Sequence, residues 1–306
     1  MSKLFKDHSM EFSFNIKLNI ALSETMGSSI SLANQKYIHY IIKHTFNKDI
    51  RVISVRIKNK LQYGCYTEIL KTLILYHILS REGSSNLFAQ ISDLNPRPIK
   101  KIKDITDFDT SKYSYWVFHY LLPLQKSLSF HRKYPFFTGK FVLPNGTSLP
   151  SSQQNIYSIS VILEDLVNIF YSYNSLILDF FSKKTSNVIL HQMVLLCIQD
   201  IFAIYSLIIE LVNCHVFLSH IPFDPSSYQM TGMKSNLDLI TSCSSQDNRL
   251  ASLIHLNAID PIPINPITNK SFFKRYGLEN IISNDQPIAE PPLDTSNDAL
   301  GCLVLE

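Results

Sequence analysis

Apolar residues recur every three or four positions along most of this chain, the spacing that brings side chains to one face of an α-helix. The clearest stripe lies between residues 66 and 81, as expected of a central helix in a bundle. The pattern therefore predicts an all-α fold. The other predicted helices cover residues 11–23, 34–45, 50–61, 111–131, 156–181, 188–220 and 226–256.

The segment from Asn34 to Thr45 divides into an apolar face and a cationic face. Asn34 is a suitable N-cap, and the first-turn amides behind it would point outward. A helix N-terminus beside lysines favours phosphate, because unpaired N–H groups and the helix dipole both attract an anion. An ordinary solvated helix face is the alternative. The cationic, hydrogen-bonding face consists of Lys36, His39, Tyr40 and Lys43.

Composition narrows the classes of function. Of 306 residues, 45% are hydrophobic and 17% charged, enough apolar surface for one sizeable core. A net charge of +3 does not indicate nucleic acid as a partner, so any basic site must be local. With eight glycines and neither GxxxxGKS/T nor GxGxxG, a glycine-rich phosphate loop is not expected, and no cofactor is indicated. Five scattered cysteines without CxxC spacing favour a reducing compartment and argue against a zinc module.

Two stretches bear on membrane topology. Residues 1–19 carry charges throughout and lack the apolar core of a secretory signal. The apolar run from Val188 to Ile221 is long enough to span a bilayer, but it contains Asp200, Glu210 and several polar residues. We therefore interpret it as a buried helix of a soluble bundle.

No catalytic constellation emerges, and we do not expect an enzyme. His77 lies within an apolar stripe and has no partner at metal-ligand spacing, which favours a hydrogen-bonded core histidine. Asp200 and Glu210 are ten residues apart in an apolar helix and suit structural hydrogen bonds better than paired acid–base chemistry. The aromatic residues around Trp116 are expected in the core, with Pro123 marking a kink or an interruption.

The composition divides the chain into three parts. Residues 1–10 form an N-terminal arm, residues 11–258 a helical domain, and residues 259–306 a proline-containing tail. Proline cannot continue a bundle of helices, so the tail is expected to be extended or disordered.

Taken in order, five segments resemble the ANTH domain, and within it the branch of huntingtin-interacting protein 1 and its yeast actin-patch counterpart. The most specific segment reads FHRKYPFFTG, from Phe130 to Gly139. The resemblance implies a right-handed helical superhelix or bundle of about eight to ten helices, as in ANTH, ENTH and VHS domains. The other segments are Ile16–Lys17 with Ser23–Thr25, Lys36–Tyr37, Tyr76–Gly83 and Arg249–Pro266.

The resemblance further implies a membrane-peripheral endocytic adaptor in the cytoplasm that binds phosphatidylinositol 4,5-bisphosphate through a Lys-x9-Lys-x-Lys/Arg-His/Tyr motif. Lys36 and Tyr37 match the last two positions of that motif. Asn34 stands where the second lysine is expected, and the first lysine position falls on or beside Leu18, with Lys17 as the nearest cation. His39 and Lys43 are the neighbouring side chains that could compensate for the lysines missing from the motif. The expected headgroup site is thus Lys17, Lys36, Tyr37, His39 and Lys43.

By resemblance, the implied partners are a phosphoinositide-containing membrane, the clathrin coat and actin-patch proteins. The coiled-coil and talin-like modules that contact clathrin light chain and actin in this branch are not in this sequence. Residues 236–240 loosely suggest a clathrin-box peptide but lack its terminal acid. The alternative hypothesis is a helical protein-interaction module with a degenerate lipid site, acting as a scaffold for coat components or membrane-protein tails.

Overall fold

The computed structural model describes residues 16–29, 31–47, 50–84, 86–87, 108–144, 148–185, 187–219 and 229–245. These residues are helical or in turns and loops, without strands, so the predicted all-α fold is confirmed for this part of the chain. Residues 16–25 form the first described helix. The labelled elements are α2 (Gln35–Thr45), α3 (Ile50–Tyr63), α4 (Tyr66–Glu82), α6 (Phe108–Lys133), the 3-10 turn η2 (Ser151–Gln153), α7 (Ile156–Ser182), α8 (Val188–Ser219) and α9 (Met230–Ser245).

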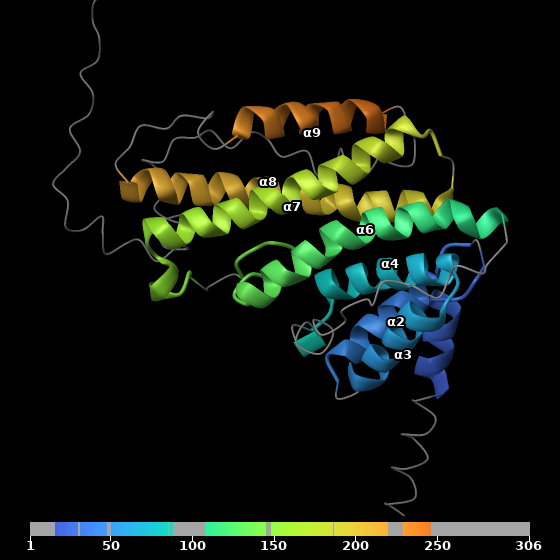
Figure 1. The fold of residues 1–306 in the computed structure, drawn as a ribbon. Helices are drawn as coiled ribbons and strands as arrows, with labels where there is room; N and C mark the ends of the chain where they lie inside the picture. The colour runs from blue at the N-terminus through green and yellow to red at the C-terminus, as the bar shows by residue number, and fades with distance from the viewer. Residues whose placement is uncertain are drawn as a thin grey trace, which may run out of the picture.

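The helix α4 lies at the centre of this arrangement (Figure 1). It contacts α2 and α3 on one side and the longer helices α6 and α8 on the other. The helices α7 and α8 run antiparallel and pack along most of their length, and α9 lies against α7. Twelve of the 17 residues of α4 are buried, which agrees with the prediction of a central helix from its apolar stripe.

Most helix boundaries agree with the periodicity of the sequence. In α3, Ile53, Ile57 and Leu61 follow at four-residue spacing and are all buried. The helix α6 continues through Pro123, so an interruption does not occur there. Pro123 is itself buried, and packing of α6 against α4 and α7 offsets the backbone hydrogen bond that a proline cannot donate.

Two helices, α7 and α8, are long and apolar enough to cross a membrane by length and composition alone. In the structure half of the most apolar window of α7 and two thirds of that of α8 are buried inside the protein. Their apolar side chains therefore form much of the core of the bundle, as predicted for the run from Val188 to Ile221.

The segment after α6 packs against the C-terminal end of α4. Phe130, Tyr134 and Phe137 are each at most 3% exposed. Phe141 adopts a left-handed φ of 57°, a conformation unfavourable for a bulky residue, while its ring is buried at 4.5 Å from the ring of His131. The aromatic residues thus pack against one another and hold a strained turn, while Lys140 pairs with Glu82 of α4 at 2.7 Å.

At two positions in this region the chain comes so close to neighbouring atoms that only glycine fits. Gly83 ends α4 as its C-cap residue, and its φ of −86° is not left-handed. A side chain at Gly83 would instead meet Leu79 and, at 3.0 Å, the hydroxyl of Thr45. At Gly139 a Cβ atom would lie 2.7 Å from the carbonyl carbon of Ser80 and would overlap the Ser80 oxygen.

Several predictions fall on residues outside the described ranges. These include the N-terminal arm 1–10, the start of the first helix, the resemblance segment Arg249–Pro266 and the tail 259–306. The domain boundaries at residues 11 and 258 therefore stay predictions. The predicted helix 226–256 is described, as α9, over Met230–Ser245.

A methyl group added at Gly139 should destabilise the protein strongly, because it would collide with backbone atoms of α4 that cannot move independently. We expect Gly139→Ala to lower the free energy of unfolding by about 2–3 kcal/mol, measured by urea denaturation. Gly232→Ala is the matched control, since its nearest neighbour is the Tyr171 hydroxyl at 3.4 Å and alanine favours the helix α9. Equal stabilities of the two variants would contradict this account of the junction.

Candidate functional site: a cationic face on α2

Three of the four side chains of the cationic face predicted on α2 are exposed to solvent, whereas Tyr40 is half-buried against the core. Lys36, His39 and Lys43 are all exposed, and spacings of three and four residues place them on one side of the helix. The eleven residues of α2 include no Asp or Glu. In the described ranges neither Lys36 nor Lys43 forms an ion pair or a side-chain hydrogen bond. Their amines are therefore available to an anion.

The opposite face fixes the orientation of α2. Ile38 and Ile41 are buried, and Tyr37 is half-buried against the core. At the C-terminal end the buried hydroxyl of Thr45 accepts a hydrogen bond from the backbone N–H of Ser84, at 2.9 Å, beyond the end of α4. The cationic side chains thus project from a helix that the core and α4 hold in place, whereas Tyr37 lies at the edge of the apolar face.

The N-terminus of α2 differs from the open anion site that we expected. The Asn34 side chain does cap the helix, and its Oδ1 accepts the backbone N–H of Lys36 at 2.9 Å. The backbone oxygen of Asn34 accepts the N–H of Tyr37, also at 2.9 Å. Two of the first three amides of α2 therefore already have acceptors. The prediction that first-turn amides would be free to bind phosphate is wrong for these two, and side chains must supply most of the binding.

Histidine 39 has one nitrogen engaged by the helix itself. Its Nδ1 lies 2.8 Å from the carbonyl oxygen of Gln35, which can only accept a hydrogen bond, so Nδ1 carries the proton. This arrangement orients the ring along the helix and leaves Nε2 for other partners.

Lys17 lies on a different helix from the other predicted site residues. It is exposed on the helix of residues 16–25, whose Asn19 accepts a hydrogen bond from Arg56 of α3 at 3.0 Å. Residues two apart differ by about 200° around a helix, so Lys17 points away from α3. Within the described residues no hydrogen bond or ion pair joins Lys17 to α2. The pairing of Lys17 with Lys36 therefore stays a prediction.

Analysis of the sequence missed a further cation, Lys71, on α4. Its side chain is only 5% exposed, and its amine lies 3.3 Å from the carbonyl oxygen and 3.4 Å from the hydroxyl of Ser29, in the connection that leads to α2. Burial lowers the pKa of Lys71, and the charge of Glu24 partly opposes this shift. The signal in the sequence was a lysine inside the apolar stripe of α4. Burying a charge at such a position costs free energy unless the charge is paired or hydrogen-bonded.

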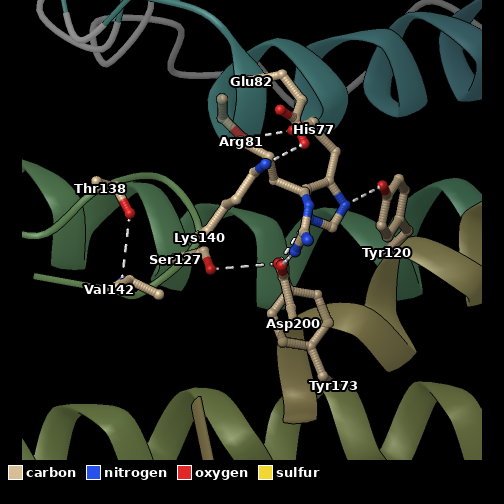
Figure 2. Close-up of polar contacts among 11 residues, drawn as sticks. His77, Arg81, Glu82, Tyr120, Ser127, Thr138, Lys140, Val142, Tyr173 and Asp200 are labelled. Atoms are coloured by element: carbon tan, nitrogen blue, oxygen red, sulfur yellow. Dashed lines mark hydrogen bonds and ion pairs between the residues drawn. The ribbon is translucent and has the colours of Figure 1, made fainter. Parts of the chain in front are cut away.

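The most concentrated polar chemistry of the structure is buried, not exposed. Figure 2 shows His77 and Arg81 of α4 meeting Asp200 of α8 and Tyr120 of α6. His77 Nε2 is 2.6 Å from Asp200 Oδ2, and His77 Nδ1 is 2.6 Å from the Tyr120 hydroxyl. The guanidinium of Arg81 pairs with the other oxygen of Asp200. We call these four residues the buried polar cluster.

The hydrogen bonds of the buried polar cluster form a consistent set. Burial and the charge of Arg81 both lower the pKa of His77 well below its usual value, so the ring is neutral. A neutral ring satisfies both contacts if Nε2–H donates to the Asp200 carboxylate and Nδ1 accepts from the Tyr120 hydroxyl. The Arg81 charge is then balanced by Asp200. The ring of Tyr173 stacks on His77 at 5.9 Å, and its hydroxyl donates to Ser127 at 3.2 Å.

This arrangement joins helices and leaves His77, Asp200 and Tyr120 closed to a substrate. His77 and Asp200 are each 1% exposed. The interpretation of both as structural, hydrogen-bonded residues is confirmed. In the described ranges no three His, Cys, Asp or Glu side chains converge as metal ligands would. The cysteines described there, Cys65, Cys197, Cys214 and Cys243, are free thiols.

Comparison with known families decides the assignment. The ANTH domain model matches residues 29–220, more than half of the chain. The chain belongs to the ANTH domain family. The matched range of this ANTH chain contains α2, α4 and the buried polar cluster, while membership of the huntingtin-interacting protein 1 branch stays a prediction.

Two solved structures share the fold of this ANTH domain. The ENTH domain of epsin-2 in complex with phosphatidylinositol 4,5-bisphosphate is 15% identical, with a TM-score of 0.59, covering 81% of this chain and 97% of that one. A chain from the endocytic adaptor complex AENTH is 16% identical, with a TM-score of 0.62, covering 78% and 96%. No curated protein sequence matches the chain.

The clathrin-box-like segment of residues 236–240 lies within α9. Leu237 and Ile240 face the core, at 6% and 0% exposure, and Leu239 is exposed. A segment that is helical and half-buried does not present an extended peptide for binding.

The buried polar cluster should be sensitive to removal of its negative charge. Asp200→Asn would leave the Arg81 charge buried without a counter-charge, at a cost of about 3 kcal/mol in unfolding free energy. Tyr120→Phe removes only a hydrogen bond to His77, at about 1–2 kcal/mol. Urea denaturation measures both, with exposed Tyr157→Phe as the control. If Asp200→Asn lowers the free energy of unfolding no more than Tyr120→Phe does, the proposed charge balance is refuted.

Stability should fall as the solution becomes acidic. Burial, with smaller contributions from His77 and Arg81, lowers the pKa of His131 to about 3. A histidine whose pKa is lower in the folded state contributes fully above its unfolded pKa of about 6.5, and this contribution is lost progressively below it. We expect His131→Phe to flatten the dependence of unfolding free energy on pH between about 6.5 and 4.5 by up to about 1.4 kcal/mol per pH unit. A core variant of similar cost, Phe130→Leu, should keep the parent slope.

Proposed function

We propose that this ANTH domain is a membrane-peripheral adaptor that binds phosphoinositide headgroups, with phosphatidylinositol 4,5-bisphosphate as the leading ligand. The observation that carries the proposal is the exposed face of α2, where two lysines and a histidine share one side of a helix without any carboxylate. Family membership and the fold shared with an ENTH domain solved with this lipid support it.

The chemistry of the face suits a multiply charged headgroup. Each lysine near an anionic membrane surface contributes about 1 kcal/mol, and the amines of Lys36 and Lys43 pay no prior cost of breaking an ion pair within the described residues. His39 Nε2 and the Tyr37 hydroxyl add hydrogen-bonding capacity at the edges of the face. We assign Lys36, Lys43 and His39 as primary contacts, with Tyr37 flanking them.

The proposed site also includes Lys17 of the first described helix and Lys71 of α4. The Lys71 amine has long hydrogen bonds to neutral oxygens of Ser29 and lies near the charge of Glu24, and a phosphate oxygen would be a stronger partner than the Ser29 oxygens. This cation would compensate for the lysine that the family motif has at the position of Asn34.

The proposed setting is the cytoplasmic face of the plasma membrane, at endocytic sites. Coupling to the clathrin coat or to actin-patch proteins belongs to the proposal through family resemblance only, since the helical clathrin-box-like segment gives it no support.

One observation favours the alternative, an interaction module with a degenerate lipid site. Leu18, on or beside the first lysine position of the motif, is 1% exposed and belongs to the core. A cation at that position would not reach a headgroup, so this chain has fewer motif cations than the family pattern.

Charge reversal on α2 tests the proposal directly. Lys36→Glu changes the local charge by two and should weaken binding to vesicles containing phosphatidylinositol 4,5-bisphosphate by about 30-fold, as measured by co-sedimentation. Lys43→Glu should act similarly. The matched control is Lys234→Glu on α9, an exposed lysine on a helix that Figure 1 places at the other side of the domain from α2. Screening over a Debye length of about 8 Å should make its effect small.

The outcomes separate the hypotheses. A parent protein that sediments equally with and without the phosphoinositide would leave only the interaction module. If phosphoinositide-specific binding is unchanged in both Lys36→Glu and Lys43→Glu, the binding site lies elsewhere on the protein. Lys71→Met, tested alongside, should weaken headgroup binding without loss of stability, because methionine keeps the apolar stem and removes a desolvated charge.

A further inference from the structure

Large apolar side chains stand exposed at both ends of the cationic face of α2. Phe46, the C-cap residue of α2, is 65% exposed, and Leu32, two residues before the N-cap, is 51% exposed. Single exposed apolar residues are common on protein surfaces. These two are notable because they flank a row of cations.

The geometry of the helix aligns Phe46 with the cations. His39, Lys43 and Phe46 follow at spacings of four and three residues, so they share one face of α2. From Lys36 to Phe46 the helix rises about 15 Å. The exposed face of α2 is therefore a strip with basic side chains along its length and an aromatic side chain at its end.

The structure keeps Phe46 from turning inward. Its backbone N–H bonds to the carbonyl oxygens of Lys43 and His44, in the last turn of α2. The preceding residue, Thr45, is fully buried, with its hydroxyl donating to the Ile42 carbonyl at 2.6 Å and accepting from Ser84. Thr45 is thus held toward α4, and Phe46, about 100° further around the helix, points to solvent.

We infer that α2 lies along the membrane plane, with Phe46 and Leu32 inserted into the interface while Lys36 and Lys43 contact anionic headgroups. The inference rests on the proposed function and adds an apolar component and an orientation to it. The argument for a lipid surface as the occupant is charge complementarity, since the strip is cationic and lacks carboxylates. Aromatic rings beside cations suit the boundary between headgroups and acyl chains.

The test uses a tryptophan placed at the predicted point of insertion. Phe46→Trp is mixed with vesicles of phosphatidylcholine and phosphatidylinositol 4,5-bisphosphate whose acyl chains are brominated near the headgroup. We expect its fluorescence to fall on binding. Trp116, 5% exposed in α6, provides a constant background, and Tyr157→Trp, at a 79% exposed position on α7, is the matched control that should not be quenched.

A second measurement separates apolar from electrostatic contributions. Phe46→Ser should weaken vesicle binding about tenfold, and this factor should be the same at about 0.1 M and about 0.3 M salt. The factor for Lys43→Gln should shrink at the higher salt, because ions screen it.

Each result has a distinct meaning. Binding that persists with no quenching at position 46, or with Phe46→Ser equal to the parent, overturns the inserted orientation and leaves the proposed function intact. No phosphoinositide-dependent binding by the parent protein defeats the proposed function itself. Quenching in both Phe46→Trp and Tyr157→Trp would indicate nonspecific insertion and also overturn the inference.

Discussion

The ion pair between Arg81 and Asp200 constrains much of this domain. An arginine at the end of α4 stays charged in a nearly dry environment, so a carboxylate must meet it, and α8 supplies that carboxylate from its interior. The second oxygen of Asp200 requires a donor, which is His77, and His77 in turn requires the hydroxyl of Tyr120. Each of these contacts fixes one helix relative to another. Three helices are thereby fixed relative to one another by bonds with defined directions, which apolar packing alone would not provide.

The same end of α4 also holds the surface of interest. Ser80 faces Gly139 in the loop after α6, and the N–H of Ser84 binds Thr45 at the end of α2. The buried polar cluster thus fixes the last turn of α4, and the last turn of α4 in turn fixes the position and orientation of the exposed face of α2. The segments Tyr76–Gly83 and Phe130–Gly139, which carried the family resemblance, meet at this junction. The spacing of the residues within these two segments reflects the packing of the fold, and none of their buried residues is open to a ligand.

How much the sequence could predict depended on the kind of interaction. Periodicity identified the helices and their buried faces, as in α3, because burial of apolar residues is a local pattern. It also marked His77 and Asp200 as structural, since polar residues within apolar stripes need partners. Their mutual contact could not be predicted, because 123 positions separate them in the chain. Lys71 was overlooked for the same reason, as its neighbour Ser29 lies 42 positions away. At Gly83 the need for glycine comes from crowding by Leu79 and by Thr45, which lies 38 positions earlier in the chain.

The cap at the start of α2 has a consequence for how the proposed headgroup site would distinguish among lipids. Because Asn34 uses the Lys36 and Tyr37 amides, rigid backbone donors make up little of the surface, and recognition falls to the ends of long, flexible side chains. Flexible ammonium groups follow the amount of negative charge more closely than the positions it occupies on an inositol ring. A domain built this way is expected to sense the charge density of a leaflet more than the stereochemistry of any one lipid in it.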